Sequence, residues 1–280
     1  MVGKNGEKTV KSEEIDLKEK GKVIRRHILE MISQAESGHP GGSMSVLEIL
    51  TVLYFRFMNH KPDDPDWEDR DRVVLCKGHA APALYSVLAE AGYFPVSELT
   101  SLRKLNSMLE GHPCRRSVPG VDVSTGSLGQ GLSIACGMAA SAKISNNSHR
   151  IFAILGDGEV QEGQVWEAAM AASHYKLDNI IAILDRNCLQ IDGPTESIMA
   201  IEPIVDKWLS FGWEVITCDG HNTEGILEAL KKADKMTGKP KIIIAKTVKG
   251  KGVSFMENVK EFHGRSLTPD EMLCAMKELE

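Results

Sequence analysis

The sequence predicts a single α/β domain, a parallel β-sheet sandwiched by helices. In the second half of the chain, short apolar runs typical of strands alternate with longer helical stretches, which is the pattern of βαβ units. The runs IFAIL and NIIAIL contain no charged residue, and such runs indicate strands buried on both faces. No flexible linker divides the chain, so we expect one domain over residues 15–280, preceded by a flexible tail over residues 1–14.

Each element follows from its local sequence. A helix is predicted over residues 16–37, with Gly38 as the glycine that ends it. After the turn HPGGS, a second helix is predicted over residues 45–57. A polar, proline-broken loop at 59–72 then leads into a short buried strand at 72–76.

The rest of the chain continues this alternation. Two helices are predicted over residues 80–93 and 97–106. Residues 106–126 carry no periodic pattern, and irregular segments of that length are usually functional or disordered. The small-residue stretch SLGQGLSIACGMAASAKI predicts a closely packed helix over residues 127–144. The remaining predicted elements are strands 151–155, 179–184, 213–218 and 241–246, and helices 162–176 and 223–235.

Composition narrows the class of protein. The formal net charge is −6 and no long basic run is present, which argues against a nucleic-acid partner. The polar N-terminal stretch lacks the apolar region of a signal peptide, and the longest apolar run is too short to span a membrane. None of the six cysteines forms a C-x-x-C pair. We therefore expect a cytoplasmic protein with reduced thiols and no membrane contact.

Histidine repeatedly lies beside glycine. Four of the nine histidines directly follow a glycine, in the stretches SGHPGG, KGHAAP, EGHPC and DGHNT. Glycine allows sharp turns and close approach of a ligand to the backbone. Turns also collect both residue types without any function, so the pattern by itself leaves a structural explanation open. The residues concerned are His39, His79, His112 and His221, and His263 has a glycine on its other side.

A second pattern indicates a metal and a diphosphate. The strand at 151–155 ends at Gly156, Asp157 and Gly158, and the next strand ends close to Asn187. In a right-handed βαβ unit both strand ends emerge at the same sheet edge, where ligands of such sheets bind. Carboxylate and amide oxygens suit Mg²⁺, with Ca²⁺ or Mn²⁺ as alternatives, and the glycines would admit phosphate oxygens. The alternative is a turn capped by Asp and Asn side chains.

These motifs together resemble the transketolase family. G-D-G followed about 30 residues later by Asn is similar to the thiamine diphosphate binding motif. The stretches SGHPGG, RDRVVLCKGHAAPALY, GHP, STGSLGQGL and DGHN resemble transketolase in order and approximate spacing, over nearly all of residues 15–270. The resemblance implies transfer of a two-carbon ketol unit from a ketose, or its phosphate, to an aldose acceptor, as in the pentose phosphate pathway. Thiamine diphosphate would carry out the breaking and forming of bonds. The protein would bind and orient the cofactor and the sugars and transfer protons.

The resemblance also implies residue roles. Asp157, Asn187 and the backbone carbonyl of Leu189 would bind the divalent ion, with Gly156 and Gly158 beside the diphosphate.

Gly126 and Leu128 would line the thiazolium pocket. Glu162 matches an acidic residue at the family's subunit interface that helps connect two cofactor sites, although a first-turn carboxylate on a helix is the alternative.

Four histidines would surround cofactor and donor sugar and act in catalysis: His39 and His263 near the donor hydroxyls, His79 near the diphosphate, and His112 near the reacting carbon. His221 is interpreted as a turn residue without chemistry. The other histidines are interpreted as structural or solvated: His27, His60, His149 and His174.

The resemblance covers only the first third of a full-length transketolase. The pyrimidine-binding domain, which supplies an activating glutamate, would have to come from a C-terminal partner subunit, in a heterotetramer with two copies of each chain. The implied enzyme is therefore a split transketolase, a transferase of aldehyde or ketone groups that is active only with its partner. Alternatives are dihydroxyacetone synthase, 1-deoxyxylulose-5-phosphate synthase, a metal-dependent phosphohydrolase on a similar sheet, and a non-catalytic homologue.

Overall fold

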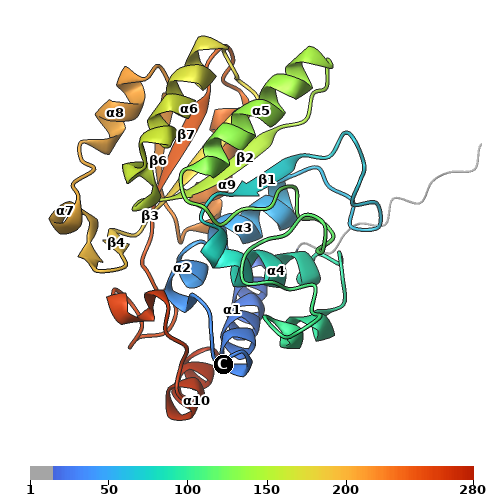
Figure 1. Cartoon of the computed structure of the whole chain (residues 1–280), viewed down its shortest axis with the longest axis vertical. Helices are drawn as coiled ribbons and strands as arrows, with labels where there is room; N and C mark the ends of the chain where they lie inside the picture. The colour runs from blue at the N-terminus through green and yellow to red at the C-terminus, as the bar shows by residue number, and fades with distance from the viewer. Residues whose placement is uncertain (1–14) are drawn as a thin grey trace, which may run out of the picture.

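The computed structural model describes residues 15–280, and the predicted tail over residues 1–14 lies outside the described residues. Its centre is a five-stranded parallel sheet with the strand order β1-β2-β3-β7-β6 (Figure 1). All five predicted strands and the predicted fold class are confirmed. The strands are β1 (Arg72–Leu75), β2 (Ile151–Gly156), β3 (Ile180–Arg186), β6 (Glu214–Asp219) and β7 (Lys241–Lys246).

Both faces of the sheet are apolar, as the uncharged strand runs predicted. In β2, Phe152 and Ile154 face one core, whereas Ile151, Ala153 and Leu155 face the other. This follows from the twofold alternation of side chains along a strand. Helices α3 (Leu47–Val52), α4 (Ala81–Glu90) and α9 (Thr223–Asp234) lie on the first side of the sheet, where α1 (Leu17–Gln34) packs against α3 and α4. Helices α5 (Gln130–Ile144), α6 (Gly163–His174) and α8 (Ile204–Ser210) cover the second side (Figure 1).

The helix bounds agree with the prediction for most of the chain. The helices that match predicted ones are α1 (Leu17–Gln34), α3 (Leu47–Val52), α4 (Ala81–Glu90), α5 (Gln130–Ile144), α6 (Gly163–His174) and α9 (Thr223–Asp234). Further elements are α7 (Thr195–Ile198), α8 (Ile204–Ser210), α10 (Pro269–Glu278), the hairpin β4 (Leu189–Gln190) and β5 (Gly193–Pro194), and the 3₁₀ turns η2 (Gly78–Ala80), η4 (Glu159–Gln161) and η5 (Lys260–His263).

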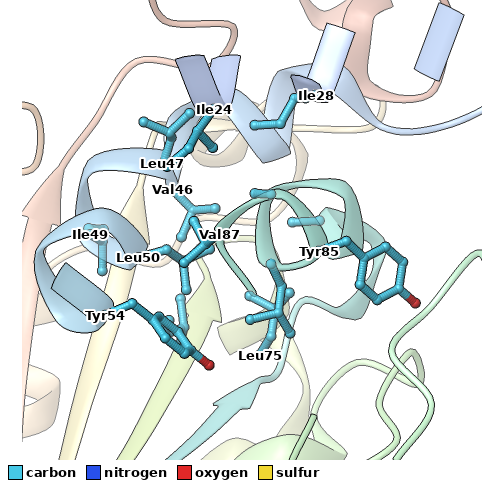
Figure 2. Packing of buried hydrophobic residues seen from close by; sticks show 14 of the residues in the cluster. Ile24, Ile28, Val46, Leu47, Ile49, Leu50, Tyr54, Leu75, Tyr85 and Val87 are labelled. Atoms are coloured by element: carbon cyan, nitrogen blue, oxygen red, sulfur yellow. The ribbon is translucent and has the colours of Figure 1, made fainter. Parts of the chain in front are cut away.

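Helix α1 packs its apolar stripe against α3 and α4. Ile24 and Ile28 are fully buried, and Figure 2 shows them in one cluster with Leu47 of α3 and Val87 of α4. The helix ends at Gln34, earlier than predicted. The left-handed residue after its C-cap is Glu36 (φ 49°), not Gly38, and the Ser37 amide donates to the Ile32 carbonyl (3.3 Å).

The turn predicted at HPGGS is wrong, because this stretch is itself helical. Helix α2 runs over Pro40–Ser45, α3 follows, and a wider π-helical turn η1 (Leu53–Phe57) completes the segment. Proline at the first helical position sets a helical φ and needs no hydrogen-bonded amide. The glycines serve close packing: a Cβ on Gly41 would lie 2.9 Å from the Phe262 carbonyl oxygen.

The helix predicted over residues 97–106 is also wrong. A 3₁₀ turn, η3 (Val96–Ser101), is followed by a loop in which Arg103 (φ 58°) and Asn106 (φ 65°) are left-handed. Left-handed residues cannot continue a right-handed helix. Residues 106–126 contain no helix or strand, as predicted. Among residues 15–280, no helix combines the length and apolar character that a membrane span needs.

Candidate active site

A cavity of about 390 Å³ opens at the carboxyl edge of the sheet, where β1, β2, β3 and β7 end. Parallel strands deliver their following residues to this one edge, so segments far apart in sequence meet there. All twelve residues implied by the motifs line this cavity: His39, His79, His112, Gly126, Leu128, Gly156, Asp157, Gly158, Glu162, Asn187, Leu189 and His263.

Asp157 and Asn187 lie side by side after adjacent strands, and both are buried. The Asp157 carboxylate accepts hydrogen bonds from the Gly158 amide (2.8 Å), the Cys188 amide (2.5 Å) and the Arg186 guanidinium (3.1 Å). The Asn187 side-chain oxygen accepts from the Leu189 amide (3.1 Å). Burial raises the pKa of Asp157, with the charge of Asp185 adding to the rise and Arg186 opposing it. Backbone amides thus fix the orientation of both oxygen donors.

The donor set fits a hard cation bound together with a diphosphate. Among residues 15–280 no group of three or more His, Cys, Asp or Glu side chains could hold a metal, so a cation here would need amide and carbonyl oxygens. The Leu189 carbonyl oxygen already accepts a hydrogen bond from a positively charged group, the Lys249 ammonium (3.3 Å). Gly158 exposes its backbone to the cavity, and a Cβ there would lie 3.1 Å from Gln190. A side chain at position 158 would occupy the part of the cavity that a phosphate would approach.

Three histidine rings form a compact triangle at one end of the cavity. Their centroids are 5.1 Å apart for His39 and His79, 5.4 Å for His39 and His263, and 5.3 Å for His79 and His263. His39 is the residue before α2, His79 lies in η2 after β1, and His263 ends η5. Three separate segments thus bring these rings together.

Burial keeps these imidazoles neutral. Burial lowers the pKa of His39 to about 4, and the charge of Arg103 adds to this effect. It lowers the pKa of His79 to about 2, helped by the charge of Lys77. It lowers the pKa of His263 to about 3, helped by the charge of Lys249. A neutral imidazole can donate from one ring nitrogen and accept at the other. The Nδ1 atom of His39 is buried and has no hydrogen-bond partner among residues 15–280. It is therefore available to a polar ligand in the cavity.

His112 approaches the cavity from the irregular segment 106–126. Gly126 has φ 151°, and a Cβ there would lie 3.0 Å from the His112 ring, so glycine permits this contact. The Tyr85 hydroxyl donates to the His112 carbonyl oxygen (2.9 Å) and holds the backbone in place. Burial, with the charge of Arg103, lowers the pKa of His112.

Two cavity lysines were missed in the sequence. The Lys77 ammonium is buried, pairs with the fully buried Asp185 and donates to the Gly42 carbonyl (2.8 Å). The Lys249 ammonium contacts His263 Nδ1 (2.8 Å), and burial with the charge of Lys77 lowers its pKa to about 8. Lys77 directly follows the strand predicted at 72–76, and Lys249 lies three residues after the strand predicted at 241–246. Their positions at strand ends were the sequence signal that could have identified them. They give the cavity the positive charge that a diphosphate would need.

Glu159 was also missed, although it directly follows the G-D-G stretch. It is buried and accepts hydrogen bonds from the amides of Gly156 and Gly129, both at 3.1 Å. Burial raises its pKa to about 7. Its carboxyl group therefore joins the end of β2 to the turn before α5. Glu162, three residues further on, lines the cavity and directly precedes α6.

His221 lies outside this cavity. Its Nδ1 contacts the Glu48 carboxylate (2.9 Å), and its Nε2 accepts from the Val248 amide (2.8 Å). Both ring nitrogens are used inside the protein, in agreement with its interpretation as a turn residue that follows a strand.

Comparison with protein families identifies this arrangement. The family model described as "Transketolase, thiamine diphosphate binding domain" matches residues 18–279, which is nearly all of the described chain.

Curated relatives fall into two size classes. The chain is 47% identical over 268 residues to a 6-deoxy-6-sulfo-D-fructose transketolase subunit of Clostridium sp. (strain MSTE9), covering 96% of this chain and 98% of that one. It is 42% identical to one of the subunits of the apulose-4-phosphate transketolase from Phocaeicola vulgatus, covering 91% and 90%. With human transketolase the identity is 44%, but the match covers 90% of this chain and only 40% of the longer protein.

Solved structures agree with this result. Transketolase from Campylobacter jejuni superposes with a TM-score of 0.89 at 36% identity, over 94% of this chain and 42% of that one. Transketolase from Leishmania mexicana gives a TM-score of 0.91 at 32% identity, over 95% and 42%.

Proposed function

The chain belongs to the transketolase family, whose thiamine diphosphate binding domain it carries, and on that premise we propose that it is the N-terminal subunit of a two-subunit transketolase. With Mg²⁺ and thiamine diphosphate, the assembled enzyme transfers a two-carbon ketol unit from a ketose to an aldose. The observation that carries the proposal is the convergence of three neutral histidines, two lysines and the Asp157–Asn187 oxygen donors on one cavity.

The metal and diphosphate would be held at the sheet edge. Asp157, Asn187 and the Leu189 carbonyl would hold the cation through oxygen atoms, which are the ligands that Mg²⁺ prefers. Lys77 and Lys249 line the same cavity and would offset the negative charge of the diphosphate. When bound there, thiamine diphosphate supplies the carbon nucleophile and the electron sink of the reaction.

The histidines would handle the sugar. In a buried site a neutral imidazole forms directed hydrogen bonds with hydroxyls, and it can accept a proton at one nitrogen while donating at the other. The free Nδ1 of His39 is available to a donor hydroxyl. His112 is the most exposed of the four cavity histidines. It is suited to contact the sugar near the two-carbon unit that is transferred.

A second polypeptide would complete the enzyme. The chain matches transketolase subunits end to end but spans about 40% of human transketolase. We propose a partner that carries the pyrimidine-binding domain and its activating glutamate, in a heterotetramer with two copies of each chain. The relatives are named for 6-deoxy-6-sulfo-D-fructose and apulose 4-phosphate, and these names favour a specialised ketose over a common pentose phosphate as the substrate.

The test is reconstitution with the partner subunit. We expect calorimetry to show thiamine diphosphate binding that requires Mg²⁺, and a panel of ketose donors to show transfer to aldose acceptors. Formation of dihydroxyacetone from formaldehyde, or of 1-deoxyxylulose 5-phosphate from pyruvate, would assign a different reaction within the thiamine enzymes. A complex that binds no thiamine diphosphate but hydrolyses phosphate esters would refute the proposal in favour of a phosphohydrolase.

A further inference from the structure

His221, in the stretch DGHNT, does not line the cavity, but its ring joins α3 to the segment after β7. The Val248 amide, two residues after the end of β7, donates to its Nε2 (2.8 Å). Its Nδ1 contacts the carboxylate of Glu48 in α3 (2.9 Å). Because an amide only donates, Nε2 carries no hydrogen, and Nδ1 donates its hydrogen to Glu48. These two contacts fix the tautomer and the orientation of the ring.

Arg25 of α1 extends this contact into a buried network of three side chains, Arg25, Glu48 and His221. Its guanidinium pairs with the second carboxylate oxygen of Glu48, and its Nε donates to the Lys251 carbonyl (3.1 Å). Burial acts to raise the pKa of Glu48, but the hydrogen bond from His221 and the charge of Arg25 outweigh it and lower that pKa. The carboxylate is therefore charged at neutral pH, and both its oxygens are paired. A buried network whose members are satisfied in this way is rigid.

The Arg25–Glu48–His221 network holds both ends of one short turn, residues 248–251. His221 accepts from the amide that begins the turn, and Arg25 donates to the carbonyl that ends it. Glycine permits the second contact, because Gly252 is left-handed (φ 97°) and a Cβ there would lie 2.6 Å from the Arg25 Nε. The position of the turn is thus set by side chains from α1, α3 and the segment after β6.

Lys249 lies within this turn and lines the cavity. Its ammonium contacts His263 Nδ1 (2.8 Å) and donates to the Leu189 carbonyl (3.3 Å). A lysine side chain is long and flexible, so the position of its ammonium depends on where its backbone is held. None of the three network residues is in the cavity lining, so the network acts on the cavity through the turn.

We propose that His221 is a positioning residue: through the network it holds the Lys249 ammonium where the diphosphate of the cofactor would lie. The inference rests on the proposed function, which supplies thiamine diphosphate as the ligand. Without the His221 ring the Val248 amide loses its acceptor and the turn is no longer fixed at its first residue. Cofactor affinity then falls, whereas ketol transfer by enzyme that has bound the cofactor is largely unchanged.

The first test measures thiamine diphosphate affinity by calorimetry with Mg²⁺, in the complex of this chain with its partner subunit. For His221→Phe, which keeps a ring but neither hydrogen bond, we expect the affinity to fall about tenfold. The kcat at saturating cofactor should change by less than about twofold. In His221→Gln the side-chain oxygen can accept from the Val248 amide, so most of the affinity should return. His60→Phe is the matched control, because His60 is also half-buried, uses both ring nitrogens (3.1 and 2.7 Å) and does not line the cavity.

A double-mutant cycle decides whether the effect passes through Lys249. Lys249→Met alone should weaken cofactor binding, and His221→Phe in that background should weaken it by less than about twofold more. Equal losses in both backgrounds would overturn the inference. So would a loss in His60→Phe as large as that in His221→Phe, because general destabilisation would then account for both.

Amide hydrogen exchange in the full chain without cofactor separates this inference from the proposed function. The Val248 amide should exchange at least about tenfold faster in His221→Phe than in the wild type, and no faster in His60→Phe. An unchanged rate contradicts the anchoring even if the complex binds cofactor. If the wild-type complex binds no thiamine diphosphate, the proposed function fails, and inorganic diphosphate with Mg²⁺ becomes the probe. Weaker diphosphate binding in His221→Phe then supports the positioning role, and equal binding refutes it.

Discussion

The chemistry of individual residues in this cavity is set by burial more than by charge pairing. His79 is the clearest case, because its ring is nearly enclosed and the neighbouring Lys77 ammonium further disfavours a second positive charge. Lys249 responds in the same direction, and its pKa falls to about 8. A site built in this way keeps its imidazoles neutral at physiological pH, which suits hydrogen bonding to hydroxyls.

The buried histidines predict how stability depends on pH. In the unfolded chain these histidines regain a pKa near 6.5. Below that pH the unfolded chain therefore binds more protons than the folded chain, and unfolding is accompanied by proton uptake. The free energy of unfolding should therefore be at its full value above pH 6.5 and fall as the pH drops from 6.5 toward 4. The slope is at most about 1.4 kcal/mol per pH unit for His79, and less for the partly exposed His39 and His263.

Urea unfolding at pH 7, 6 and 5 measures this slope. His79→Asn should flatten it, whereas substitution of the exposed His174 by Asn should leave it unchanged. A slope that is identical in all three proteins would show that the histidine cluster does not carry the effect.

Asp157 predicts the metal dependence of cofactor binding. In the assembled complex, Asp157→Ala should weaken Mg²⁺-dependent thiamine diphosphate binding by more than about 100-fold, because a charged oxygen ligand is removed. Calorimetry measures the affinity, and thermal unfolding checks that the loss of contacts with Arg186 and Cys188 has not unfolded the chain. Asp192→Ala, an exposed carboxylate lining the same cavity, is the control. Unchanged affinity in Asp157→Ala would place the metal elsewhere.

At the scale of elements, close packing of small residues determines the positions of the segments that carry the site. The N-terminal turn of α5 rests directly on the end of β1, where a Cβ on Gly131 would lie 2.6 Å from Cys76. The same reason explains why α2 is helical despite two consecutive glycines. Glycine is a weak helix former, and here contact with the neighbouring segment outweighs its propensity.

Helix α5 offers an internal test of this packing. Gly131→Ala should lower the free energy of unfolding by about 1–3 kcal/mol, because the rigid Cys76 backbone cannot move aside. Gly137→Ala in the same helix has nothing within 4 Å of its Cβ and should be neutral or stabilising by up to about 1 kcal/mol. Chemical denaturation of the lone chain compares them, and equal effects would mean that α5 has room to shift.

At the scale of the whole molecule, the cavity lies at the carboxyl edge of the sheet, and its lining among residues 15–280 comes from many separate segments of the chain. The chain spans about 40% of human transketolase, and the relatives that it matches end to end are themselves named as subunits. The proposed reaction therefore depends on a surface that a second polypeptide would bring.

The corresponding prediction concerns the chain alone. Purified without its partner, it should transfer no measurable ketol unit even with saturating Mg²⁺ and thiamine diphosphate, because we propose that the activating glutamate comes from the partner. Titration with the partner should restore activity and level off at one partner per chain. Robust transfer by the lone chain, with partner contamination excluded by mass spectrometry, would contradict the split arrangement.

The sequence by itself determined the sheet, most of its helices and the meeting of Asp157 and Asn187 at the carboxyl edge, whereas the cavity histidines were implied only by the resemblance to transketolase. These depend on local rules: uncharged apolar runs form buried strands, and parallel strands deliver their next residues to one edge. The helical state of Pro40–Ser45 and the loop at Arg103 were decided by tertiary contacts, against local propensity. So were the neutral state of His79 and the placement of Lys77 and Lys249, because burial and the distance between segments exist only in the folded chain.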